Sequence, residues 1–221
     1  GKKTCRVRKT LAYFDDQQTF LELTATAILY NKILLGDDLL AIRLNGTSDI
    51  LWETLEFTVS PELSLFWRIK FGIYIVPTTY QSIPHMFAHY PELRIKLYDY
   101  TKNRHNWAEC KAIGYHLTYS FDGWDNAKNI KLCKEALING VNVAAAFNVK
   151  KGHKLPNELN VDRLNLRTKY TFTGGVLPVV DGDLTDFRPS DPAMGIIIGL
   201  RFKLPHGIQY SQAEKLAFCI A

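Results

Sequence analysis

Short apolar segments that lead directly into polar residues recur along this chain, and they limit its possible folds more than any other feature. The first, residues 40–50, carries Arg43 inside an apolar run, where we expect it to be buried, and then continues as Asn-Gly-Thr-Ser-Asp. A parallel β-strand has this pattern when it delivers polar groups to the carboxyl edge of a sheet. The repetition predicts an α/β protein with a polar site at one edge of its sheet.

Helical and strand patterns alternate along most of the chain. Apolar residues recur at helical spacing between Asp15 and Gly36 and again over residues 61–71, 82–90 and 124–139. We expect strands at residues 39–44, 93–102, 115–120, 141–147, 176–180 and 195–203. Strands separated by helices favour a mainly parallel sheet. About six strands are too few for a complete eight-stranded barrel, so we predict a partial or irregular (βα) barrel or an open doubly wound sheet.

The length of 221 residues predicts a single α/β domain over residues 1–221. A hydrophobic insertion around residues 57–80 and a basic loop around residues 150–170, predicted to contain a short helix, interrupt the regular alternation. The net charge of +5 is compatible with nucleic acid or another anionic ligand. A charge of this size does not by itself establish such a partner.

The four cysteines are widely spaced and none belongs to a C-x-x-C pair. This spacing predicts reduced thiols and a location in the cytoplasm of a host cell. The sequence has no apolar run approaching the roughly 20 residues of a membrane helix, and its start lacks the apolar core of a signal peptide. We therefore expect no membrane partner.

Polar residues at the ends of the expected strands form the candidate site. Carboxylate, ammonium, imidazole and hydroxyl groups that meet at one sheet edge can bind phosphate or transfer a proton. The predicted catalytic residues are Asp49, Asp99, Lys102 and His116. The predicted ligand-binding residues are Arg43, Asn45, Ser48, Ser120, Asp183 and Arg188. For Asp49, capping of a helix that begins near residue 50 is an equally strong interpretation.

Four carboxylates and one arginine are concentrated in residues 181–192. Such an oxygen-rich loop suits a divalent metal such as Mg²⁺ or Ca²⁺, although Asp-Gly-Asp and Ser-Asp-Pro are also ordinary turn sequences. The structural alternative is a carboxylate of this loop paired with Arg188. His85 and His89 have the i, i+4 spacing of zinc ligands on a helix, but packing or surface placement is the simpler interpretation.

Five motifs in this order resemble a family of uncharacterised bacteriophage proteins: RLNGTSDI, YDYTK, YHLTYS, DGD and IIGL. More distantly, the chain is similar to phage proteins that look like relatives of radical-SAM barrels. Those relatives carry a cysteine-rich segment before the first helix, whereas this chain has only Cys5 there. A [4Fe–4S] cluster needs three or four converging thiolates, so the sequence does not support an iron–sulfur cofactor.

Three interpretations of function stay open. The first is an enzyme that acts on a phosphate-containing ligand, a nucleotide or nucleic acid, with Asp49 or Asp99 as acid/base or metal ligand and His116 as proton shuttle. The second is a non-catalytic protein that contacts nucleic acid through its basic N-terminal residues and residues 150–154. The third is a factor that binds a host protein through the aromatic insertion around residues 66–74.

Overall fold

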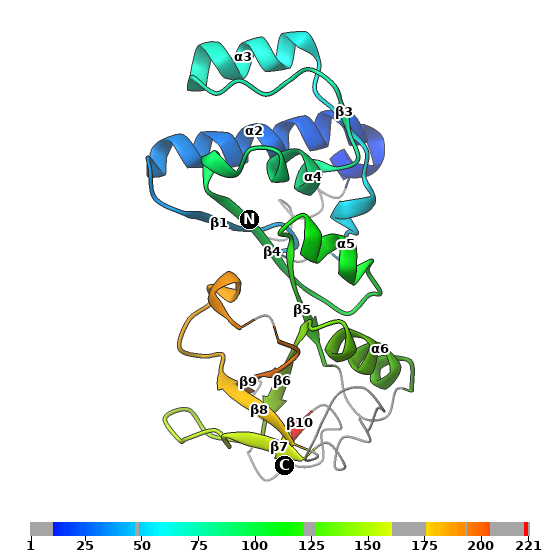
Figure 1. Ribbon diagram of the computed structural model, residues 1–221, viewed down its shortest axis with the longest axis vertical. Coiled ribbons are helices and arrows are strands. Elements are labelled where there is room, and N and C mark those ends of the chain that lie inside the picture. Colours follow the sequence, from blue (N-terminus) through cyan, green and yellow to red (C-terminus); the bar gives the residue numbers. More distant parts are fainter. Residues whose placement is uncertain are drawn as a thin grey trace. The chain divides into compact units, whose positions relative to one another are not determined.

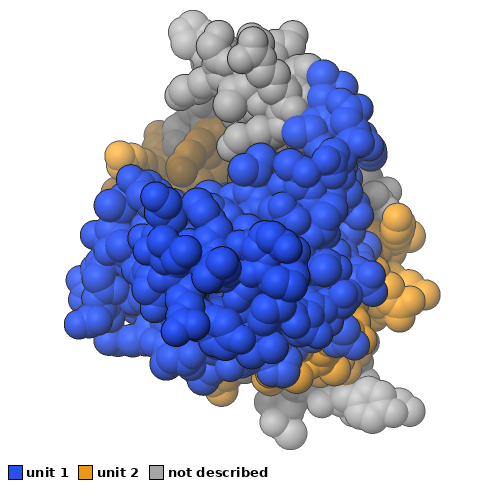
Figure 2. Space-filling view, turned by 90° about the horizontal axis from the view of Figure 1, so that it is seen from above, with its two compact units in different colours: residues 1–44, 50–97, 113–115 blue, residues 45–49, 98–112, 116–221 orange. Residues whose placement is uncertain are grey.

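A computed structural model describes residues 11–46, 49–121, 127–160, 176–192, 194–203 and 219–220, and the following account concerns these residues. The chain divides into two compact units (Figure 2). Unit 1 comprises residues 1–44, 50–97 and 113–115, and unit 2 comprises residues 45–49, 98–112 and 116–221.

Helix α2 (Gln17–Leu35) is the longest element of unit 1. It begins where the Asp16 carboxylate accepts a hydrogen bond from the backbone N–H of Thr19, and it ends at Gly36, whose φ of 69° favours glycine. The other elements are β1 (Leu40–Arg43), η1 (Trp52–Thr54), β2 (Phe57–Thr58), α3 (Pro61–Phe71), β3 (Thr79–Tyr80), α4 (Ile83–Ala88), η2 (Pro91–Leu93) and the start of β4 (Ile95–Thr101).

The predicted insertion at residues 57–80 forms β2, α3 and β3 in unit 1. Strands β2 and β3 pair antiparallel, and Trp67 of α3 is fully buried. Its indole Nε1–H donates to Thr26 Oγ1 of α2 at 2.9 Å, which joins the two helices. Burial of this large ring with its polar atom satisfied anchors α3 to α2.

Unit 2 contains the main part of the sheet. Its elements are the remainder of β4, α5 (Trp107–Ala112), β5 (His116–Ser120), α6 (Ala127–Ile138), β6 (Asn142–Phe147), β7 (Glu158–Asn160), β8 (Val176–Asp181), η3 (Arg188–Ser190), β9 (Ile197–Arg201) and β10 (Cys219–Ile220). The strands pair in the order β4-β5-β6-β9-β8-β7, all in parallel except β7, which is antiparallel to β8. Strand β10 pairs in parallel with the end of β6.

The predicted α/β class with a mainly parallel sheet is confirmed. Strand β1 neighbours β4, and among the described residues the path of paired strands ends at β1 and β7, so the sheet is open, as in a partial barrel. We expected a loop around residues 150–170. This expectation is wrong for residues 158–160, which form β7. There the side chain of Leu159 is buried between two exposed residues, the alternation that an edge strand produces. Residues 161–170 lie outside the described part.

Opposite faces of the sheet in unit 2 have different coverings (Figure 1). Alternation along β5 directs Tyr119 toward α6, where its hydroxyl donates to the backbone oxygen of Asn129 at 3.3 Å. The alternate residues His116, Thr118 and Ser120 lie on the other face, where η3 packs against β5. In the described part of the chain, no helix is both long and apolar enough to cross a membrane.

Candidate functional site

The end of β4 brings together two residues of the predicted catalytic set. The Asp49 carboxylate accepts a hydrogen bond from Thr101 Oγ1 at 3.0 Å and another from the backbone N–H of Lys102 at 3.4 Å. Asp49 and the exposed Lys102 are therefore neighbours, as the strand-end argument predicts. The capping interpretation of Asp49 is wrong, because η1 begins after Leu51 and has no capping side chain.

Asp99 is fully buried within β4, and its carboxylate accepts a hydrogen bond from the backbone N–H of Asn45 at 2.6 Å. These two predicted site residues thus lie together and fix residues 45–49 to the strand. A charged hydrogen bond of this kind is worth about 1.5–3 kcal/mol. A proton-transfer role for Asp99 and a ligand-binding role for Asn45 stay predictions.

Two other residues of the first motif, Arg43 and Ser48, were predicted to bind the ligand, and that role stays a prediction for both. Arg43 is exposed, so its predicted burial is wrong. Strand β1 is the last strand at its end of the sheet and its other residues are only half-buried, so the strand has no enclosed position for a long side chain at its end. Ser48 lies outside the described residues.

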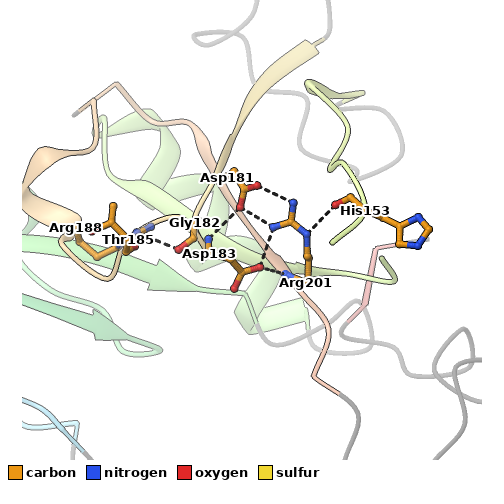
Figure 3. A network of polar contacts seen from close by, with 7 residues as sticks. All are labelled: His153, Asp181, Gly182, Asp183, Thr185, Arg188 and Arg201. Carbon is orange, nitrogen blue, oxygen red and sulfur yellow. Dashed lines mark hydrogen bonds and ion pairs between the residues drawn. The ribbon is translucent and has the colours of Figure 1, made fainter. Parts of the chain in front are cut away.

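A lysine-rich turn follows β6 at the carboxyl edge of the sheet. We call residues 150–154 (Lys-Lys-Gly-His-Lys) the lysine turn; all five are exposed. The backbone N–H of His153 donates to the oxygen of Lys150 at 3.1 Å, which closes the turn. Arg201, the last residue of β9, donates from Nε to the backbone oxygen of His153 at 2.8 Å (Figure 3).

Arg201 is itself held by two carboxylates of the predicted acidic loop (Figure 3). Its Nη1 and Nη2 lie 2.7 Å from the two oxygens of Asp181, and its Nη1 lies 3.2 Å from Asp183. Hydrogen bonds from Arg201 hold the pKa of Asp181 below its usual value. Two carboxylates that we predicted as metal or ligand contacts therefore bind the guanidinium of Arg201. A metal at this loop stays a prediction.

Sequence reasoning missed Arg201, although the signal was present. The apolar run of β9 ends in this arginine, the same pattern that drew attention to residues 40–50. Its partners Asp181 and Asp183 come from the neighbouring strand β8 and the turn after it. That neighbour relation depends on strand order, which the sequence does not specify.

A second group of polar residues comes from β5 and from η3 with its C-cap, which are in contact; we call His116, Thr118, Arg188 and Asp191 the η3 cluster. Arg188 is fully buried, and its Nη2 donates to the backbone oxygens of Gly182, at 3.1 Å, and Thr185 (Figure 3). Its Nη1 lies 3.1 Å from Asp191 Oδ2. The predicted pairing of Arg188 with a carboxylate of its own loop is confirmed.

His116 lies at the opposite end of its strand from the position we expected. It is the first residue of β5, so its backbone is at the amino edge of the sheet, whereas Ser120 is the last residue and lies at the carboxyl edge. Burial lowers the pKa of His116, and the positive charge of Arg188 lowers it further. His116 is therefore neutral at pH 7, and its roles as catalyst or proton shuttle stay predictions.

Unit 1 contains a pocket of about 620 Å³ beside α4. The two histidines of the i, i+4 pair, His85 and His89, both line it, together with Tyr80 and Tyr90. The Ser82 hydroxyl lies 2.7 Å from Nδ1 of His85, and the tyrosine hydroxyls lie 3.1 Å apart. Packing explains part of this arrangement, because Tyr80 is buried and its ring contacts that of His89.

Comparison with known proteins gives one family. The sequence profile described as Gene product 88 matches residues 2–221, nearly the whole chain. No curated protein and no solved structure matches the chain significantly.

Proposed function

The chain belongs to the Gene product 88 family, a phage family that fits the resemblance seen in the motifs, and from the geometry of unit 2 we propose that it binds nucleic acid. The phosphate groups would lie along the carboxyl edge of the parallel sheet. The observation that carries this proposal is the lysine turn, which presents three exposed lysines and is clamped to β9 by Arg201.

Exposed cations follow several strands at this edge. Lys102 follows β4, the lysine turn follows β6, and Lys203 follows β9. Three strand spacings separate β4 from β9 in the sheet order, a distance of about 14 Å. Cations spread over this length suit the repeated phosphates of a polymer better than a single phosphate group.

The acidic groups at the same edge have partners of their own. Asp181 and Asp183 are paired with Arg201, and Asp49 accepts hydrogen bonds from the end of β4. The clamp also fixes the backbone of the lysine turn before binding, which lowers the entropy lost when a ligand orders it. Lysine contacts to phosphates supply affinity without sequence preference.

Catalysis on the bound nucleic acid stays a prediction. Only Asp49 and Lys102 of the four predicted catalytic residues lie together at the carboxyl edge. Proton transfer by His116 to a phosphate at that edge would require the ligand to reach the other end of β5.

Host-protein binding is a second candidate function, and one observation favours it. In unit 1, α3 and the segment after it expose Phe66, Ile69 and Tyr74, with 43%, 70% and 55% of their surface accessible. Groups of exposed apolar side chains are typical of protein-binding surfaces. Pull-down from host lysate with an Ile69→Asp variant as control tests this alternative, and equal recovery of partners by both proteins would contradict it.

The lysine turn gives the sharpest test of nucleic-acid binding. We expect a Lys150→Gln/Lys151→Gln/Lys154→Gln variant to bind a fluorescent oligonucleotide about tenfold or more weakly at moderate salt, because three phosphate contacts are lost. The matched control replaces three exposed lysines elsewhere with glutamine, Lys70, Lys111 and Lys131. Equal losses in the two variants, measured by fluorescence anisotropy, would show that only net charge matters and would refute the assigned surface.

A further inference from the structure

We propose that the pocket beside α4 in unit 1 binds a neutral sugar. The pocket lies where α4 contacts β3, and it is lined by residues 76, 78–81, 85, 89 and 90. It includes the two histidines of the i, i+4 pair, which the proposed function leaves without a role. The lysine turn belongs to the other unit, so sugar binding here does not depend on nucleic-acid binding there.

The pocket has room for such a ligand and is open to it. Its volume of about 620 Å³ falls within the range of roughly 300–1,000 Å³ that small-molecule sites occupy. Most of the residues that line it are exposed, so a ligand can enter from solvent without displacing a buried side chain. The pocket can therefore hold a sugar ring while a further ring of the same molecule stays in solvent.

The side chains that line the pocket favour an uncharged ligand. Among the described residues, this lining contains no aspartate, glutamate, lysine or arginine. An ion would exchange part of its hydration for uncharged groups, which is costly without a partner of opposite charge. Zinc is disfavoured because the lining offers two imidazoles but no carboxylate or thiolate, whereas even catalytic zinc sites use three protein ligands.

Three polar side chains of the lining have unused hydrogen-bonding capacity. Within the part of the chain that the structure describes, the side chains of Thr78, Gln81 and His89 make no hydrogen bond with the protein. A hydroxyl, a carboxamide and a neutral imidazole can each both donate and accept. Sugar hydroxyls also donate and accept, so they can pair with all three groups. The edge of a nucleobase has a fixed order of donors and acceptors and needs a matching fixed order in its site.

Aromatic rings supply the apolar part of the pocket. The ring centroids of Tyr80 and His89 lie 5.9 Å apart and their planes are inclined at 50°. Inclined rings form a corner, whereas a flat heterocycle stacks on parallel ring faces. The C–H groups of a sugar ring can pack against a ring edge or face. His89 and Tyr90 are both partly accessible and are available for this contact.

Hydrogen bonds hold the wall of the pocket in place before any ligand binds. The backbone N–H of Val76 donates to the Tyr90 hydroxyl at 2.8 Å, and the Tyr80 hydroxyl donates to the backbone oxygen of Val76 at 3.0 Å. Burial and the hydrogen bond with Tyr90 raise the pKa of Tyr80, so its hydroxyl stays protonated. On α4, the hydroxyl of the buried Ser82 holds Nδ1 of His85 at 2.7 Å. A wall fixed in this way loses little entropy on binding.

The first test measures binding of neutral disaccharides to the wild-type protein. We expect at least one of maltose, cellobiose, lactose and chitobiose to bind saturably with a Kd on the order of 1 mM, because an open pocket covers only part of the ligand. In an NMR titration, backbone amide signals within residues 76–90 should shift and those of unit 2 should not. Binding of none of the four sugars, or shifts confined to other residues, would overturn the proposal.

Probes of other chemistry separate a sugar site from its alternatives. We expect neither uracil nor inorganic phosphate to compete with the bound disaccharide, and we expect EDTA to leave its affinity unchanged. Competition by uracil would assign the pocket to flat heterocycles, and competition by phosphate would assign it to anions. Loss of binding on addition of EDTA would assign the histidine pair to a metal. Each of these three results would overturn the sugar assignment.

Two substitutions in the lining test the contacts themselves. Gln81→Ala should weaken disaccharide binding at least threefold because one hydrogen bond is lost, and His89→Ala should weaken it at least as much because a ring contact is lost as well. Both residues are exposed, so we expect both variants to keep the fold. Gln17→Ala, at an exposed glutamine of α2 outside the lining, is the matched control. Equal affinities of all three variants would place the sugar elsewhere and overturn the proposal.

Discussion

Thr118 offers a stability test of the η3 cluster that needs no ligand. Replacement by valine removes a hydroxyl that is 0% exposed and has no hydrogen-bond partner, and it keeps the shape of the side chain. Burial of an unpaired hydroxyl costs about 1–3 kcal/mol in protein mutational data. We therefore expect Thr118→Val to raise the free energy of unfolding of the ligand-free protein by about 1–2 kcal/mol.

For a chain of 221 residues, each kcal/mol corresponds to about 2–4 °C in Tm. Urea unfolding followed by circular dichroism, together with a thermal melt, measures both quantities. A loss of stability on Thr118→Val would show that the hydroxyl has a partner, such as an ordered water, and would refute the reasoning.

Thr26 provides the matched control. Its hydroxyl accepts a hydrogen bond from the indole N–H of the fully buried Trp67. Thr26→Val leaves that donor unpaired, and we expect it to destabilise the protein by about 1–3 kcal/mol. Opposite changes in the free energy of unfolding for the two threonine substitutions would show that hydrogen bonding of the hydroxyl determines the outcome. The replacement of threonine by valine would then have no fixed effect of its own.

Two further predictions concern packing and pH. Gly199→Ala should destabilise the protein by about 1–3 kcal/mol, because the new Cβ would lie 2.8 Å from a methyl group of Val179. As the control, Gly46→Ala should change the free energy of unfolding by less than about 0.5 kcal/mol in the same urea experiment, because its new Cβ would have no atom within 4 Å. The pKa of His116 is lowered in the folded state by burial and by Arg188. The unfolded chain therefore binds more protons than the folded chain as the pH is lowered through about 6.5, and the free energy of unfolding decreases as the pH decreases. His116→Gln should reduce this fall between pH 7 and pH 5.5, and identical pH profiles of the two proteins would contradict the assignment.

Local signals in the sequence predicted much of the fold. Asp16 and Gly36 delimit α2 because one caps the first turn and the other adopts a positive φ, and both effects depend on a few adjacent residues. The strands β4, β5, β6 and β9 lie within the ranges that their apolar runs indicated, and β8 extends one residue past its range. The run of residues 142–147, buried on both faces, is typical of a central parallel strand.

The candidate site was harder to predict because it depends on strand order and strand ends. We expected His116 and Ser120 together at the carboxyl ends of the strands, although the strand predicted at residues 115–120 begins beside His116; in the structure His116 begins β5 and Ser120 ends it. The pairing of Arg201 with Asp181 joins residues 20 positions apart on neighbouring strands, so it follows from strand register rather than from local sequence. Arg43 shows the same limit, since its exposure results from the position of β1 at the end of the sheet.

The salt dependence of oligonucleotide binding tests the central claim most directly. Affinity of the wild-type protein for a single strand, measured over a series of salt concentrations, gives a slope of log affinity against log salt that reports the number of phosphate contacts. We predict that the triple glutamine variant of the lysine turn makes this negative slope shallower by about 2, at roughly 0.7 for each lost contact. A wild-type affinity that does not fall with salt, or a slope that the triple variant leaves unchanged, would contradict nucleic-acid binding at the carboxyl edge of the sheet.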